Sequence, residues 1–230
     1  MFIKKIKDVC CICGNPIDGT GYRFDSWGNR CHLTHYTSTC HNCGRIVPVG
    51  QELCASCRKS CVTSENRLRV QFIYGEVKTR LASMGIRLPK DNLTISIVNR
   101  QKLSSLLNCG SADNFDGLTI TEVSLSGKRH HVYLLESLPV IRYKTALAHE
   151  CAHVFLNERD SALNREHLRE VEGFCQLVAY KVLLFDDTKE SEIMRSSLLQ
   201  SQDPIYGEGF RIMKRREEQW GWPRMLAKYS

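Results

Sequence analysis

A His-Glu-x-x-His pentapeptide, His149 to His153, is the group of residues in this sequence that most clearly predicts chemistry. It lies in the apolar run 146–156, which contains no Gly or Pro and therefore predicts a helix. On a helix, His149 and His153 lie four residues apart on one face, where two imidazoles can bind one metal ion. Glu150 lies beside them, where its carboxylate can activate a water molecule. The motif predicts the site of a zinc peptidase.

A catalytic zinc needs a third protein ligand, and Glu172 is our candidate. Eighteen residues separate Glu172 from His153, and Glu172 lies in a second helical stretch, 166–180. This spacing is the His-Glu-x-x-His-x18-Glu pattern of gluzincins. Gln176 follows one turn later, and we expect it to hold the outer nitrogen of His149. Gly173 should let the two helices approach closely.

His167 offers a different third ligand. It follows His153 after 14 residues, about the distance at which SprT-like proteases, which cut proteins crosslinked to DNA, carry a third histidine. The segment 66–90, with six basic residues and one acidic residue, would then contact nucleic acid. We favour Glu172, because SprT-like proteases carry their zinc ribbon after the protease domain, whereas here the cysteine-rich part comes first. Nucleic acid is therefore not the favoured partner. A basic segment of this kind more often forms a solvated linker helix.

Two groups of paired ligands precede this site. Each contains two close pairs, the spacing with which zinc knuckles hold a tetrahedral ion. The groups are Cys10, Cys13, His32 and His35, and then Cys40, Cys43, Cys54 and Cys57. We expect two structural zinc ions, because so short a segment cannot bury much apolar core and metal binding must contribute to its folding. Cys11, Cys31 and Cys61 remain as alternative ligands or packing residues, and Cys31 could replace His32 or His35.

Nine of the twelve cysteines lie at or before Cys61, which indicates a domain boundary. We expect a zinc-binding module over 1–63, a basic linker helix over 64–90 and a metallopeptidase domain over 91–230. The fold class is α+β, with a small sheet ahead of a pair of active-site helices. The sequence contains no apolar run near 20 residues and no signal-peptide pattern, so we expect a cytoplasmic protein without a membrane segment, whose cysteines stay reduced.

The cysteine-rich segment, with Trp27-Gly28 ahead of its histidines, resembles a LIM domain. Further motifs follow in order: Leu138-Pro139, Leu147-Ala148-His149-Glu150-x-x-His153, Val171-Glu172-Gly173-Phe174-Cys175-Gln176 and Tyr206-Gly207-Glu208-Gly209-Phe210-Arg211. From Cys10 to Arg211 the chain thus resembles the LIM-domain peptidases whose plant members are ubiquitin-activated and restrict organ growth. The resemblance implies one catalytic zinc on two histidines and a glutamate, and endopeptidase cleavage of regulatory proteins. Ubiquitin is not an expected partner, because only nine residues precede Cys10, where the plant proteins carry ubiquitin-interacting motifs.

The sequence therefore predicts a zinc metalloendopeptidase with Glu150 as general base. Tyr206 is a candidate to stabilise the oxyanion of a tetrahedral intermediate. The expected partners are protein or peptide substrates and a protein bound by the LIM-like head. The rival hypothesis is a non-catalytic, zinc-dependent adaptor that keeps the peptidase half as a scaffold.

Overall fold

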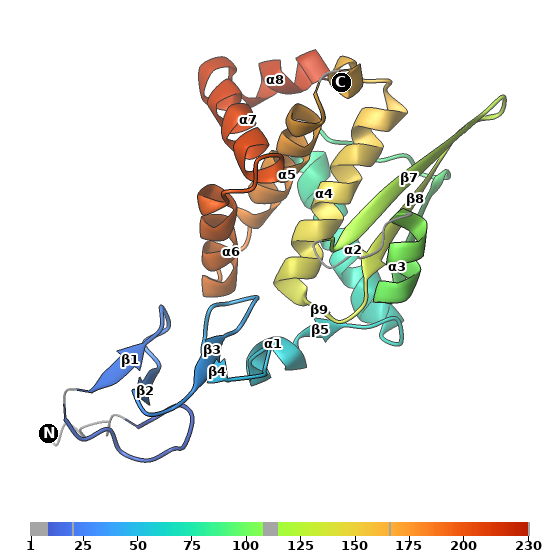
Figure 1. The fold of residues 1–230 in the computed structure, drawn as a ribbon. Coiled ribbons are helices and arrows are strands. Elements are labelled where there is room, and N and C mark those ends of the chain that lie inside the picture. The colour runs from blue at the N-terminus through green and yellow to red at the C-terminus, as the bar shows by residue number, and fades with distance from the viewer. Residues whose placement is uncertain (1–8, 20, 108–114, 166, 230) are drawn as a thin grey trace, which may run out of the picture. The chain divides into compact units, whose positions relative to one another are not determined.

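The computed structural model describes residues 9–19, 21–107, 115–165 and 167–229 (Figure 1). The chain divides into two compact units, Met1–Ser60 and Cys61–Ser230. Both helices and small sheets occur, so the fold is mixed α+β, as expected. No helix in the described ranges is long and apolar enough to cross a membrane.

The described part of the first unit contains two short hairpins and one short helix of a turn and a half. Strands β1 (Tyr22–Phe24) and β2 (Arg30–His32) pair antiparallel, as do β3 (Thr37–Thr39) and β4 (Ile46–Pro48), and α1 (Ala55–Lys59) follows. Its buried cluster consists of four cysteines and Val47. With so little apolar core, this unit depends on what its cysteines bind.

The second unit contains a three-stranded sheet in the order β6-β8-β7. Strand β8 (Gly127–Leu135) lies between β6 (Leu93–Val98), which is parallel to it, and β7 (Gly117–Ser124), which is antiparallel. The hairpin turn between β7 and β8 uses Gly127 at φ +117°, a conformation that favours glycine. A separate pair joins β5 (Cys61–Val62) to β9 (Leu138–Pro139). In the sheet, β7 has β8 as its only neighbour among the described strands, so its other edge is free of a strand.

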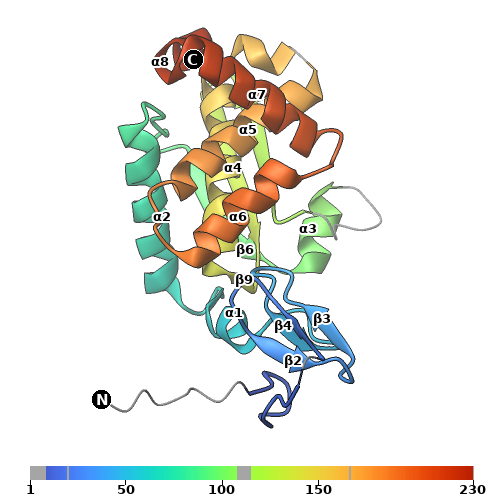
Figure 2. The same ribbon diagram turned by 90° about the vertical axis from the view of Figure 1, so that its left-hand side faces the viewer.

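Helices make up the rest of the second unit. They are α2 (Arg67–Ser83), α3 (Arg100–Leu107), α4 (Val140–Glu158), the 3-10 helix η1 (Ala162–Arg165), α5 (Leu168–Leu183), α6 (Lys189–Gln200), α7 (Tyr206–Trp220) and α8 (Trp222–Tyr229). Helix α4 lies between the sheet on one side and α5, α6 and α7 on the other (Figures 1 and 2). This central place explains why fourteen of its nineteen residues are buried.

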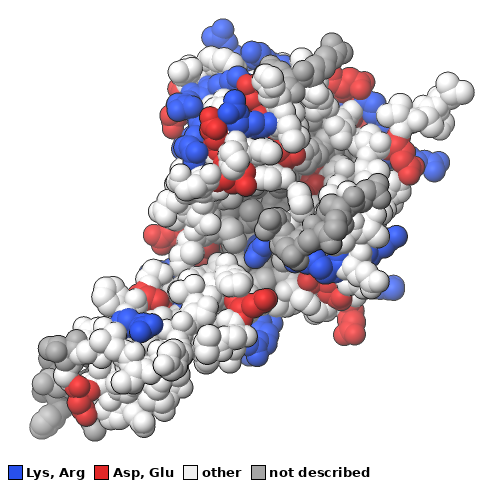
Figure 3. Space-filling model, viewed as in Figure 1, with Lys and Arg blue, Asp and Glu red and all other residues white. Residues whose placement is uncertain are grey.

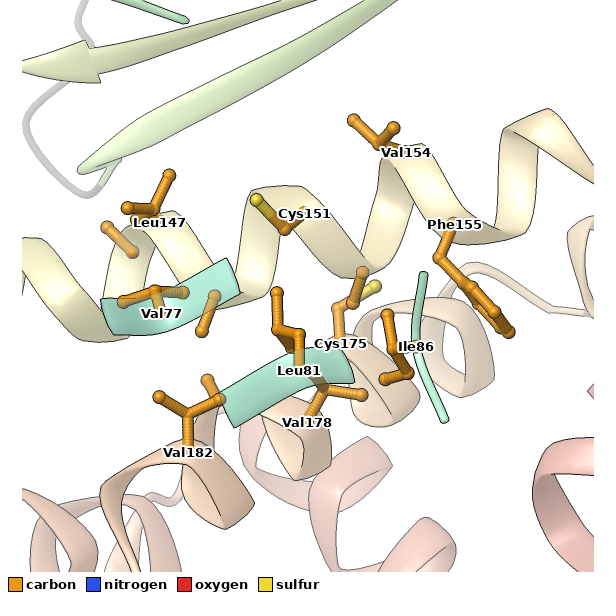
Figure 4. Close-up of a cluster of buried hydrophobic side chains, with 14 of the residues drawn as sticks. Val77, Leu81, Ile86, Leu147, Cys151, Val154, Phe155, Cys175, Val178 and Val182 are labelled. Carbon is orange, nitrogen blue, oxygen red and sulfur yellow. The ribbon is translucent and has the colours of Figure 1, made fainter. Parts of the chain in front are cut away.

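Helix α2 packs inside the second unit, which differs from the linker expected over 64–90. Ile73, Val77 and Leu81 are buried on it and join the same core cluster as residues of α4 and α5 (Figure 4). Arg80, one of the basic residues of this segment, pairs with Glu76 on its own helix and with an aspartate that follows α5. The buried apolar residues of α2 thus anchor this helix in the core of the second unit. On the face shown in Figure 3, basic and acidic side chains of the second unit are interspersed.

Gly173 acts at a different helix contact from the one expected. A Cβ built on Gly173 would lie 2.2 Å from the carbonyl carbon of Gly209 on α7, and one built on Gly209 would lie 2.0 Å from the carbonyl oxygen of Arg169. The two glycines therefore let α5 and α7 touch backbone to backbone, whereas we expected Gly173 to face α4. This contact holds Tyr206, the first residue of α7, beside α5.

We predict that Gly173→Ala destabilises the protein by about 1–3 kcal/mol, because the added methyl group forces α5 and α7 apart. The matched control is Gly75→Ala on α2, where a Cβ meets no atom within 4 Å. That change should be neutral or stabilising by about 0.5–1 kcal/mol, since alanine favours a helix interior. Urea unfolding of the three proteins measures the difference, and equal stability of the two variants would contradict the close contact.

Candidate metal centres

Three predicted ligand atoms converge between α4 and α5. The Nε2 atoms of His149 and His153 lie 3.2 Å apart, and Oε2 of Glu172 lies 3.0 Å from the first and 3.5 Å from the second. Helical spacing brings the histidines to one face of α4, as the sequence predicts, and the packing of α5 on α4 brings Glu172 to them. Each atom offers a lone pair to the same point, which is the arrangement a cation requires.

The electrostatics of this cluster favour positive charge. Burial raises the pKa of Glu172, but its hydrogen bonds to the two histidines and their charge lower it well below its usual range. Burial lowers the pKa of His153, but the facing groups of Cys175, Glu172 and Glu150 raise it well above 6.5. A positive charge at this point, whether a proton on His153 or a bound cation, would balance the carboxylates.

Glu150 is held by strand β7. The hydroxyl of Thr119 lies 2.7 Å from Oε2 of Glu150, to which it can donate, and 3.1 Å from the Glu150 carbonyl oxygen. Gly117 leaves the space that the glutamate occupies, because a Cβ there would lie 2.9 Å from its Cγ and Oε1. Neither Thr119 nor Gly117 carries a sequence signal for this role, since it depends on how β7 packs on α4.

Cys175 is a fourth group at this site that the sequence motifs do not identify. Its Sγ and the nitrogens of His149 and His153 all lie within 4.8 Å of one another. Cys175 is fully buried, and a hydrogen bond to it helps raise the pKa of His153. The one sequence feature that could have identified Cys175 is its helical position, three residues after Glu172.

One other prediction differs from the structure. Nδ1 of His149 has no hydrogen-bond partner among the described residues, so Gln176 does not hold it. Position 175 rather than 176 lies against the histidines, because it is Cys175 that α5 presents to α4 at this point. His167 is exposed just before the start of α5 and is not in the metal-binding group.

The predicted site residues line one cavity of about 240 Å³, together with β7 and the end of α3. These residues are His149, Glu150, His153, Glu172 and Tyr206. The ring centroid of Tyr206 lies 6.1 Å from that of His149. Asp203 fixes the start of α7, because its Oδ1 accepts the backbone N–H groups of Ile205 and Tyr206 at 2.8 Å. Burial and the nearby carboxylates raise the pKa of Tyr206, so its hydroxyl stays protonated at neutral pH.

The first unit contains the two other groups that could hold metal ions. The first comprises Cys10, Cys13, His32 and His35. Nδ1 of His32 lies 3.7 Å from Sγ of Cys13 and 3.4 Å from Nε2 of His35. Its other nitrogen, Nε2, lies 3.1 Å from the carbonyl oxygen of Pro16, to which it can donate. This bond leaves the Nδ1 lone pair directed at the cluster.

The second group comprises Cys40, Cys43, Cys54 and Cys57, all buried. Sγ of Cys43 and Sγ of Cys54 lie 3.7 Å apart. Burial raises the pKa of Cys54, but hydrogen bonds from Cys57 and Arg45 lower it to about 7, which favours a thiolate. The Arg45 guanidinium stacks 3.4 Å from the Trp27 ring centroid, next to these sulfurs.

The remaining cysteines of this region lie outside both groups. Cys31 is fully buried on β2, Cys11 is exposed, and Cys61 belongs to β5 of the second unit. None of the three replaces a predicted ligand in the described groups. His32 and His35, rather than Cys31, therefore belong to the group that contains Cys10 and Cys13.

Comparison with protein-family models, with curated proteins and with solved structures finds no match for this chain.

We predict that a strong chelator unfolds the first unit and leaves the second folded. Cysteine ligands make up most of the first unit's buried cluster, whereas the second has a large apolar core. Hydrogen exchange with mass spectrometry should show backbone amides of 21–60 losing protection while those of α4 and α5 keep it. Unchanged protection of 21–60 in the metal-free protein would contradict the prediction.

Proposed function

We propose that this protein is a zinc metallopeptidase of gluzincin type. The observation that carries the proposal is the convergence of His149, His153 and Glu172 beside Glu150 on one cavity. A metal ligand set next to a buried carboxylate is the combination with which metallopeptidases activate water for peptide hydrolysis.

The distances suit zinc. Tetrahedral zinc with nitrogen and oxygen ligands at about 2.0–2.1 Å places the ligand atoms about 3.3–3.4 Å apart, and sulfur ligands at about 2.3 Å lie about 3.8 Å apart. The two histidine nitrogens and the Glu172 oxygen are separated by 3.0, 3.2 and 3.5 Å. The sulfurs of Cys43 and Cys54 are separated by 3.7 Å. We therefore propose three zinc ions, one for catalysis and two for structure.

Zinc bound between α4 and α5 would polarise the scissile carbonyl and acidify the attacking water. Glu150 takes a proton from that water and returns it to the leaving amine. Thr119 keeps the Glu150 carboxylate pointing into the cavity through its 2.7 Å hydrogen bond. Tyr206, protonated at neutral pH, can donate to the oxygen on which negative charge develops.

Strand β7 offers a place for the substrate. Its edge away from β8 has no neighbouring strand in the described sheet, and Gly117, Leu118 and Thr119 on it line the cavity. An extended peptide can pair with that edge through backbone hydrogen bonds. We propose that protein substrates bind there in an unfolded or locally extended form.

The first unit would serve as a docking or regulatory module. A zinc site with four protein ligands has no position for a water molecule, so neither group there is expected to be catalytic. The resemblance to LIM-domain peptidases implies the same arrangement, in which one unit is catalytic and the other binds partners. The SprT-like alternative is not favoured, because the exposed His167 does not join the ligand cluster.

We predict that the zinc-loaded protein cleaves an unfolded protein such as casein and that Glu150→Gln lowers the rate at least about 100-fold while zinc stays bound. Mass spectrometry of the products and zinc analysis of the protein measure the two effects. The control is Glu218→Gln, an exposed glutamate on α7 that does not line the cavity and should keep full activity.

Cleavage by Glu150→Gln at the wild-type rate would contradict the proposed mechanism. Absence of cleavage by the zinc-loaded wild type over a range of unfolded substrates would instead support a non-catalytic adaptor.

A further inference from the structure

We infer that the cavity beside the metal site selects substrates with an uncharged, apolar side chain next to the scissile bond, and that Leu107 and Phe115 determine this selectivity. The inference rests on the proposed function, because the occupant is the peptide that the site cleaves. It adds the chemical class of residue at which cleavage occurs, which the metal ligands and the general base do not set.

The lining of the cavity is of two chemical kinds. One kind is polar and comprises the metal ligands, the general base and Tyr206. The other kind is apolar, with Leu107 at the end of α3 and Phe115 just before β7. Both residues are half-buried and pack against the core of the second unit. Their remaining exposed surface is apolar area that a substrate side chain can remove from water.

The charges on the lining favour a neutral occupant. Glu150 and Glu172 are the only acidic side chains among the described residues that line the cavity, and none of those residues is Lys or Arg. Two carboxylates match the charge of one divalent cation. A charged substrate side chain would therefore lose hydration in the cavity without gaining an ionic partner, which is unfavourable.

Three contacts hold Phe115 and the residue after it in place. Nη1 of Arg100 on α3 donates a hydrogen bond to the carbonyl oxygen of Phe115 at 2.9 Å. Arg142 on α4 pairs with the Asp116 carboxylate, and the N–H of Leu135 on β8 donates to the Asp116 carbonyl oxygen at 2.8 Å. Two helices and a strand thus fix this apolar surface before substrate arrives, as a selective pocket requires.

The size of the cavity fits one such side chain. Its volume is about 240 Å³. An apolar protein cavity of about 150 Å³ holds a molecule of benzene. The side chains of leucine, methionine and phenylalanine therefore fit beside the metal site, and we expect cleavage next to these residues.

Peptide binding to the zinc-loaded, full-length Glu150→Gln protein tests the inference without turnover. The peptides carry a fluorophore and differ only at one central position, which is Leu, Phe, Ala, Asp or Lys. Fluorescence anisotropy should show that the Leu and Phe peptides bind at least about tenfold more tightly than the Ala peptide, because several apolar carbons enter the pocket. The Asp and Lys peptides should bind no more tightly than the Ala peptide.

Variants of the lining locate the contact. Adding Phe115→Ala or Leu107→Ala should remove most of the tenfold difference, and Phe115→Leu should keep it. The matched control is Phe72→Ala, an exposed phenylalanine on α2 that does not line the cavity and should leave every affinity unchanged. With the wild type, mass spectrometry of a cleaved peptide library should show enrichment of apolar residues at one of the two positions that flank the cut.

The outcomes separate this inference from the proposed function. Equal binding of the Leu, Ala and Asp peptides, with cleavage that shows no apolar enrichment, overturns the inference and leaves the peptidase intact. A Leu advantage that persists in both Phe115→Ala and Leu107→Ala also overturns it, because the contact then lies elsewhere. Selective binding without any cleavage by the wild type overturns the proposed function and leaves an apolar peptide-binding pocket.

Discussion

The second unit is organised around three lone-pair donors that point at one another inside the protein. Two imidazole nitrogens and a carboxylate oxygen lie 3.0 to 3.5 Å apart, with little water to screen them. Such an arrangement is stable only when a hydrogen-bonding proton or a cation lies among the three atoms. In the metal-free protein the proton on His153 has that role, which its raised pKa expresses.

The rest of the unit keeps this cluster in place. Helix α4 is buried over fourteen of its nineteen residues, so the backbone that carries the two histidines is held by packing on several sides. The backbone contact between Gly173 and Gly209 brings α7 against α5 and places Tyr206 at the cavity. Strand β7 closes the other side, where Thr119 and Gly117 fix the position of Glu150. Fixed positions matter, because a general base must lie within hydrogen-bond reach of its proton before substrate arrives.

The sequence predicts the parts of the site that depend on local periodicity. Spacing within one helix places His149, Glu150 and His153, and the interval to Glu172 brings the second helix to them. Contacts set by the angle between elements are not available from periodicity. For this reason the sequence predicts neither Cys175 nor Thr119 at the site, and it places Gly173 at a contact with α4 rather than with α7. The α+β class with a small sheet could be predicted from the sequence, whereas the place of α2 in the core depended on tertiary packing.

The central claim is that a zinc ion lies among His149, His153 and Glu172. Anomalous diffraction at the zinc absorption edge from crystals of the zinc-loaded protein tests it most directly. We predict three anomalous peaks per chain, one of them within zinc-ligand distance of the two Nε2 atoms and the Glu172 carboxylate. Two peaks confined to the first unit, or a third peak beside His167, would contradict the account.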